Sequence, residues 1–165
     1  MIARGFKTKR NAPLGEYRFT EVFIGVENSP TLLRVFGSQR TMLKIVHHIK
    51  LRVVDSDSGI WLDYGTGSIC IGSKYLLGAK VNYLYLDVVH VLVHMKQFLD
   101  GKELYDQTFE YVDRPTEIEA YRYTVEEAKR LEMTEDDILK YLRVDAVDDA
   151  ELGRLIEKIG VRPRR

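Results

Sequence analysis

The sequence predicts an α+β fold in which a small antiparallel strand meander packs on a layer of helices. Short β-branched or aromatic segments, bounded by Gly, Ser and Asp, fill much of the chain before residue 72. Longer segments with helical periodicity follow from about residue 82 onward. The 165 residues, 45% hydrophobic and 30% charged, have the length and composition of one globular domain.

The first 15 residues are expected to form a loose basic arm. They carry Arg4, Lys7, Lys9 and Arg10 and no apolar periodicity. A solvated tail is favoured over a nucleic-acid-binding segment, because the whole chain balances 25 Lys and Arg against 25 Asp and Glu.

Residues 16–43 are expected to form one strand and one helix. Tyr17–Val26 alternates aromatic or β-branched residues with polar ones, which indicates a strand. Ser29 is suited to cap a helix and Pro30 to occupy its first position, so a helix is expected from Pro30 to about Gln39.

Three segments are expected to form the antiparallel meander. Lys44–Val54 is rich in β-branched residues, and Ile60–Tyr64 is expected to pair back onto it as a hairpin, with Ser68–Ile71 as a further short strand. Two adjacent histidines of the first segment, His47 and His48, then point to opposite faces of the sheet. They are therefore interpreted as packed or solvated groups.

A central helix is predicted over residues 82–99. Its apolar residues cover most of its circumference, which is typical of a buried helix. His90 and His94 lie on this helix. Buried imidazoles need hydrogen-bonding or metal partners, so both are candidate functional residues.

Three more helices are predicted toward the C-terminus. Thr116–Glu132 follows a Pro and completes a core of residues 44–132. Thr134–Leu142 and Asp148–Ile159 then form a C-terminal helical region, residues 133–165, each with acidic residues in its first turn.

The spacing of His90 and His94 predicts a zinc site. Residues four apart lie on one helix face, as they do in the H-E-x-x-H motif of zinc enzymes. Protein zinc sites use at least three side-chain ligands. Glu117, near the start of the next helix, is expected to be the third, because an antiparallel return would bring it to the ion.

This arrangement resembles the gluzincin branch of the zincin metallopeptidases, in its compact, minimal form. The matching residues are His90-Val-Leu-Val-His94 and the downstream Glu117-Ile-Glu-Ala120, within about residues 44–131. The resemblance implies a zincin-like fold with His90, His94 and Glu117 as zinc ligands.

The sequence departs from that family at Val91, where the family has the glutamate that acts as general base. Such a base contributes about 10²–10⁴-fold to the rate, so standard peptidase activity is not expected. Asp87, one turn before His90, is the candidate substitute base, and otherwise a partner that orients an imidazole. Glu119, about 200° around the helix from Glu117, and Tyr121 are candidates for supporting the ligands.

Three functions remain open from the sequence. The first is a metal-binding protein without standard peptidase activity, the second is a metal-dependent hydrolase with a substituted base, and the third is a metal-free structural or interaction protein. A protein or peptide partner is expected, nucleic acid is not, and the oligomeric state is not predicted. The single Cys70, with no apolar run long enough for a membrane span and no signal peptide, favours the cytoplasm.

Overall fold

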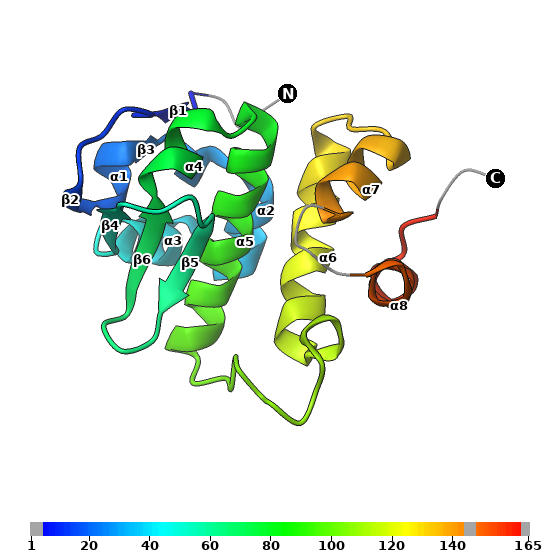
Figure 1. Ribbon diagram of the computed structural model, residues 1–165. Helices are drawn as coiled ribbons and strands as arrows, with labels where there is room; N and C mark the ends of the chain where they lie inside the picture. The colour runs from blue at the N-terminus through cyan, green and yellow to red at the C-terminus, as the bar shows by residue number, and fades with distance from the viewer. Residues whose placement is uncertain (1–4, 144–147, 163–165) are drawn as a thin grey trace.

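The architecture is α+β, with a small sheet on one side of a long central helix and further helices on the other (Figure 1). The computed structural model describes residues 5–143 and 148–162. The described strands are β1 (Lys7–Thr8), β2 (Gly15–Arg18), β3 (Phe23–Ile24), β4 (Lys50–Val54), β5 (Ile60–Asp63) and β6 (Ser68–Gly72).

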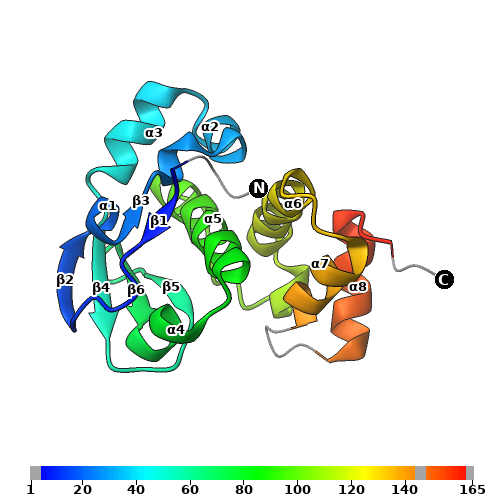
Figure 2. The same cartoon turned by 90° about the horizontal axis from the view of Figure 1, so that it is seen from above.

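The helices are distributed around the long central one and do not form one regular layer (Figure 2). None of those in the described ranges is both long and apolar enough to cross a membrane. They are α1 (Phe19–Val22), α2 (Pro30–Phe36), α3 (Gln39–Val46), α4 (Ser73–Gly78), α5 (Val81–Leu99), α6 (Pro115–Arg130), α7 (Glu135–Arg143) and α8 (Asp149–Ile159), with short 3₁₀ turns at Val26–Asn28 and Tyr111–Asp113.

The larger sheet is mixed, in the order β2-β4-β6-β5, so the expected antiparallel meander is wrong in its pairing. β5 pairs antiparallel with β6 and not with β4, and β4 runs parallel to β6. The physical reason is burial. Every residue of β6 is buried, so β6 takes a central position, whereas β5 is only partly buried and takes the edge.

The predicted strand over residues 44–54 begins later than expected, because its first part is helical. Ser38 caps α3 by accepting a hydrogen bond from the Thr41 amide at 3.1 Å, and Met42 and Val46 are buried one turn apart. Alternating burial starts only at β4. His47 and His48 therefore lie exposed in the turn between α3 and β4, not on a strand.

The N-terminal region is more structured than expected. Within the supposed loose arm, β1 pairs antiparallel with β3 and Ala12 is buried, while residues 1–4 lie outside the described part. The single strand expected over residues 17–26 is divided into the end of β2, the short helix α1 and β3. Phe19 and Val22 of α1 are fully buried, so core packing overrides the strand propensity there.

The helices predicted after residue 80 are confirmed to within two residues at either end. α7 begins after Thr134, whose hydroxyl accepts a hydrogen bond from the Asp137 amide at 3.1 Å. α8 begins with a capping box formed by Asp148 and Glu151. Capping residues and acidic first turns were therefore sufficient to place these elements.

Helix α5 occupies the middle of the molecule, with β5 on one side and α6 on the other (Figures 1 and 2). Its side chains are buried around most of its circumference, as its composition predicts. α6 runs back along α5 in the opposite direction (Figure 1). This pairing places residues from the first half of α6 beside the second half of α5.

A buried carboxylate joins α6 to α5 and α2. Glu127 has no exposed surface and accepts hydrogen bonds from Tyr85 of α5 and Thr31 of α2, both at 2.6 Å. Arg130 Nε donates to the same carboxylate at 2.9 Å. Burial by itself raises the pKa of Glu127, but the hydrogen bonds from Arg130, Thr31 and Tyr85 outweigh it and leave the pKa lowered.

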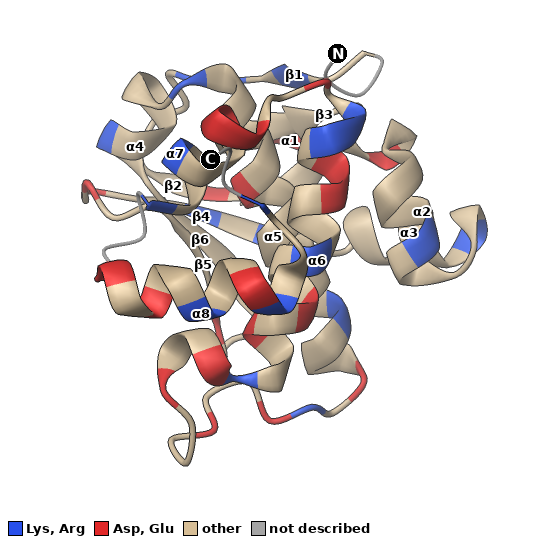
Figure 3. Cartoon of the chain, turned by 90° about the vertical axis from the view of Figure 1, so that its right-hand side faces the viewer, with Lys and Arg blue, Asp and Glu red and all other residues tan. Residues whose placement is uncertain are grey.

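The C-terminal helices carry charged residues of both signs (Figure 3). α8, for example, presents Glu151 and Glu157 together with Arg154 and Lys158. Arg154 pairs with Glu110 and Lys158 with Asp113, so charges of α8 hold it against the 3₁₀ turn before α6.

Replacing Glu127 by Gln is expected to lower the free energy of unfolding by about 3 kcal/mol, because it leaves Arg130 without its buried partner. The value lies at the low end of the usual range because 34% of the Arg130 side chain is in water. Chemical denaturation measures the change. Glu126→Gln, which breaks an exposed pair with Arg34, is the matched control and is expected to cost under about 1 kcal/mol.

The difference in stability between wild type and Glu127→Gln is expected to depend on pH. The pKa of Glu127 is lowered in the folded state, so its contribution is complete above the unfolded value of about 4.3 and is lost as the pH falls below it. The stability difference between wild type and Glu127→Gln should therefore narrow progressively as the pH falls below about 4.3. A difference that stays constant over that range would contradict this assignment.

Candidate metal centre

Helices α5 and α6 bring together the three residues predicted as metal ligands. His90 Nε2 and His94 Nε2 lie 3.1 Å apart. Glu117 Oε2 lies 3.2 Å from the former and 3.3 Å from the latter. Of the described residues, these three form a cluster that could hold a metal ion.

The cluster is largely shielded from water. The side chains of His90 and His94 are 15% and 13% exposed, and that of Glu117 is 9% exposed. The two histidines share one face of α5 because they are one turn apart, and Glu117 reaches them from the first turn of α6. The antiparallel helix pair thus produces the cluster from two distant parts of the chain.

Thr124 determines which nitrogen of His90 faces the cluster. The Thr124 hydroxyl donates its hydrogen to the Ala120 carbonyl at 2.8 Å, so it can only accept from His90 Nδ1, 3.2 Å away. Nδ1 of His90 therefore carries the hydrogen. In the neutral ring, Nε2 then presents its lone pair toward His94 and Glu117.

Gln97 determines the tautomer of His94 in the same way. Its amide nitrogen donates to the Thr116 carbonyl and to Glu119 Oε1, both at 2.9 Å, which leaves Gln97 Oε1 as an acceptor. His94 Nδ1 lies 2.8 Å from that oxygen and donates to it. Nε2 of His94 therefore also presents a lone pair to the cluster.

The centre of the cluster consequently contains three acceptor atoms and no donor when both imidazoles are neutral. Two lone pairs and a carboxylate oxygen at 3.1–3.3 Å repel one another unless a cation lies among them. That cation is either a metal ion or a proton on one imidazole. Ligand atoms about 2.0–2.1 Å from a tetrahedral ion lie about 3.3 Å apart, which these separations match closely.

The charge state of Glu117 suits either cation. Burial by itself raises the pKa of this carboxyl, but when the imidazoles are protonated the hydrogen bonds and positive charge from His90 and His94 outweigh it. The net effect holds the pKa of Glu117 well below its ordinary value, so the side chain is a carboxylate.

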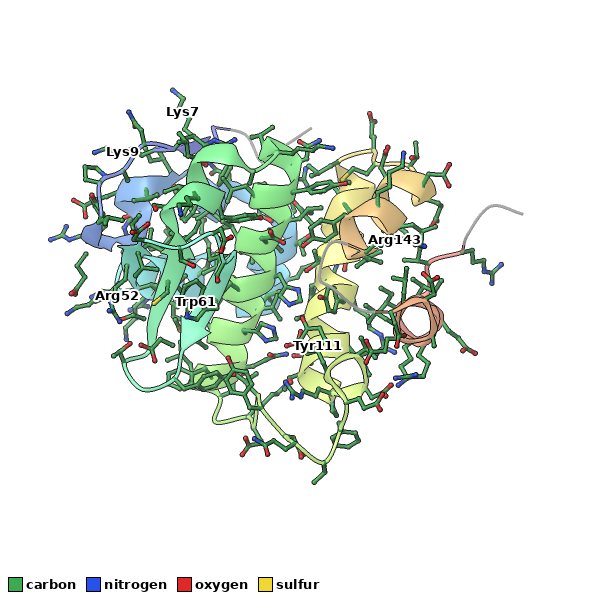
Figure 4. The ribbon with its side chains drawn as sticks, viewed as in Figure 1. Lys7, Lys9, Arg52, Trp61, Tyr111 and Arg143 are labelled. Atoms are coloured by element: carbon green, nitrogen blue, oxygen red, sulfur yellow. The ribbon has the colours of Figure 1, made fainter. Side chains whose placement is uncertain are left out.

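A cavity of about 190 Å³ opens onto the cluster. Trp61 of β5 and Tyr111, just before α6, lie on its two sides (Figure 4). Tyr64 and Tyr105, whose ring centroids are 4.3 Å apart, also line it, together with Val91. The space beside the cluster is therefore bounded mainly by aromatic and aliphatic side chains.

Asp87 lies apart from the three clustered residues, in a neighbouring cavity of about 110 Å³. Its carboxylate accepts hydrogen bonds from Tyr75 of α4 and from Tyr141 of α7, the latter at 2.6 Å. The two cavities share three lining residues, Ile60, His90 and Tyr111. Asp87 is thus one side chain away from the cluster and is held by tyrosine hydroxyls.

Glu119 contacts the cluster through Gln97, and Tyr121 contacts it directly. Glu119 acts through Gln97, because it accepts the amide hydrogen that orients Gln97 toward His94. Tyr121 places its ring 4.5 Å from the ring of His90, and its hydroxyl lies 3.0 Å from that of Tyr111.

The sequence interpretation missed Thr124 and Gln97, which orient the two imidazoles. Gln97 is three residues after His94 and is 1% exposed, and Thr124 is seven residues after Glu117 and fully buried. Both spacings place a residue on the same helix face as a ligand. Polar residues at these spacings from a candidate ligand were the available signal.

Comparisons with models of known protein families, with curated protein sequences and with solved structures found no match to this chain. The interpretation of the cluster therefore depends on its own geometry.

Replacing Gln97 by Leu is expected to weaken metal binding about 10–100-fold, since the group that orients His94 is lost while all three ligands remain. Competition with a chromophoric chelator measures the affinity. Lys96→Ala, at a half-buried position of the same helix where the side chain pairs with Asp100 outside the cluster, should leave the affinity unchanged. An unaltered affinity in Gln97→Leu would show that His94 is oriented by something else.

Proposed function

We propose that the protein is a zinc-binding protein with a zincin-like arrangement of ligands and without standard peptidase activity. His90, His94 and Glu117 hold the ion. The observation that carries the proposal is the convergence of two Nε2 lone pairs and one carboxylate oxygen, with both imidazole tautomers determined by other side chains.

The donor set supports zinc as the ion. Two neutral imidazoles and one carboxylate are a common zinc ligand set, and they leave one position of a tetrahedral ion open. The Irving–Williams order places zinc above manganese and iron(II) at such a site. A zinc ion bound there would act as a Lewis acid and polarise an oxygen atom of a small molecule that binds beside it.

Three features of the fold support a zincin-like arrangement. Both histidines lie on one helix, Glu117 comes from the following antiparallel helix, and the edge strand β5 packs beside the histidine helix. The resemblance of the two sequence motifs to gluzincins agrees with this placement.

Val91 is the reason to propose binding rather than peptide hydrolysis. It is 2% exposed and forms part of the wall of the cavity beside the cluster. An aliphatic side chain cannot accept a proton, and a missing general base costs about 10²–10⁴-fold in rate. The cavity is therefore interpreted as a site where a small molecule binds to the ion without being hydrolysed.

A second candidate function is hydrolysis with Asp87 as the base. The observation that favours it is the pair of adjoining cavities: Asp87 lines one, the cluster lines the other, and His90 lines both. If the protein is such a hydrolase, the wild-type protein should turn over unstructured peptides at a measurable rate. Asp87→Asn should abolish that turnover while leaving the metal content unchanged.

Purified, untagged protein is expected to contain about one zinc ion per chain, and His94→Ala and Glu117→Gln are expected to lose it, because two remaining side-chain ligands are too few. Elemental mass spectrometry measures zinc, iron and manganese in the same sample. His47→Ala, which removes an exposed histidine outside the cluster, should retain the metal.

The possible outcomes separate a metal-binding protein from a metal-free one. Zinc lost only in the ligand variants supports the proposal. A different metal lost in the same variants would keep the site and change the ion. Protein that contains no metal and takes none up from added zinc would overturn the proposal, and would leave His90 and Glu117 as an internal ion pair of a metal-free protein.

Replacing Val91 by Glu is expected not to produce an efficient peptidase. The new carboxylate would enter a wall packed for an aliphatic side chain, and burying a poorly paired charge there should lower stability by more than about 2 kcal/mol. Turnover of casein and the free energy of unfolding are measured together. Val91→Gln separates the effect of size from that of charge, and rapid casein turnover by Val91→Glu would contradict this view of the cavity.

A further inference from the structure

A second, larger hollow lies away from the metal centre, between α3, the turn that joins β5 to β6, and the C-terminal end of α5. Its volume is about 640 Å³, and none of its lining residues lines the cavity beside the cluster. Neither the ligands nor the residues that orient them belong to it. We call it the α3–α5 groove.

The floor of the α3–α5 groove is apolar. Ile45 and Ile49 come from α3 and the turn after it, and Met95 and Leu99 from the last two turns of α5. Leu99 is 53% exposed, so its apolar side chain is open to solvent where it lines the groove. An apolar ligand in the groove would cover the exposed surface of Leu99 and displace the water in contact with it.

One rim of the groove is cationic. Arg40, Lys44 and His48 follow one another at intervals of four residues, so they form a single row along α3 and its C-terminal turn. The lining of the groove includes no acidic residue. Across the described ranges, the side chains of Arg40 and Lys44 are exposed and have neither a hydrogen bond nor an ion pair.

The stability of α3 does not account for this row. Like charges four residues apart on a helix destabilise it by about 0.2–0.5 kcal/mol per pair. The helix dipole favours cations at the last turn, which suits Lys44, but it disfavours Arg40 in the first turn. An anion bound at the rim would offset both effects.

We propose that the α3–α5 groove binds an amphipathic carboxylate, a single alkyl chain with one anionic head group. The chain lies over Ile45, Met95 and Leu99, and the head group lies at Arg40 and Lys44. The volume of the groove is within the range of about 300–1,000 Å³ usual for sites that hold molecules of this size. This binding is independent of the metal centre.

Isothermal titration calorimetry with dodecanoate, below its micellar concentration, tests the proposal. Dodecyltrimethylammonium has the same chain with the opposite charge, and dodecanol has the chain without a charge. Dodecanoate is expected to bind one molecule per chain, at least about tenfold more tightly than either. Equal affinity for dodecanoate and dodecyltrimethylammonium would overturn the proposal, because it would show adsorption of any surfactant.

Two surface variants test the place of binding. Lys44→Glu reverses a charge at the rim and Leu99→Asp places one on the floor, and each should weaken dodecanoate binding at least about tenfold. Lys129→Glu, an exposed lysine on α6 outside the groove, is the matched control and should bind normally. Circular dichroism is used to check that all three variants are folded.

The metal content of the same variants keeps this test separate from the proposed zinc site. Lys44→Glu and Leu99→Asp should retain the wild-type metal content, whatever that content is.

Undiminished dodecanoate binding in both variants would overturn the proposal. So would a failure of dodecanoate to bind while an acidic amphipathic peptide binds, since the groove would then be a surface for a protein partner.

Discussion

The burial of α5 on nearly every side is the constraint on which the rest of the structure depends. A helix placed between a sheet and another helix has little room for polar groups, yet α5 carries Tyr85, His90 and His94 toward α6. Each polar atom buried there needs a partner. α6 supplies these partners, so the polar pattern of one helix determines that of the other.

Two carboxylates of α6 meet α5 at separate levels. Glu127 accepts from Tyr85 near the start of α5, and Glu117 lies against the two histidines farther along. The carboxylates are ten residues apart, or about 15 Å along the helix axis. Contacts at two levels prevent either helix from sliding or rotating against the other. The cluster is thereby held on rigid elements, which is what a metal site requires.

The hydrogen-bond partners of the imidazoles give the cluster its chemical character. Thr124 and Gln97 accept from the Nδ1 atoms, so the Nε2 atoms are left as electron-pair donors toward Glu117. The orientation of Gln97 depends in turn on Glu119 and a backbone carbonyl. Two lone pairs and a carboxylate oriented toward one point favour a cation there. Val91, beside them, has no group that could act as a general base.

The sequence by itself determined the α+β class, the long buried helix, the helices after it and the three clustered residues, because these follow from periodicity, caps and the spacing of His90 and His94. It did not determine the strand order or the helix α3, since local propensity does not distinguish a short helix from the start of a strand. Only the tertiary structure decided that β6 is central, that Tyr75 and Tyr141 hold Asp87, and that Thr124 and Gln97 orient the imidazoles. Gln97 is close to His94 in the chain, but the contacts of Gln97 with Thr116, of Thr124 with His90 and of Tyr141 with Asp87 join different helices or their ends, and their energies exist only when the helices are packed together.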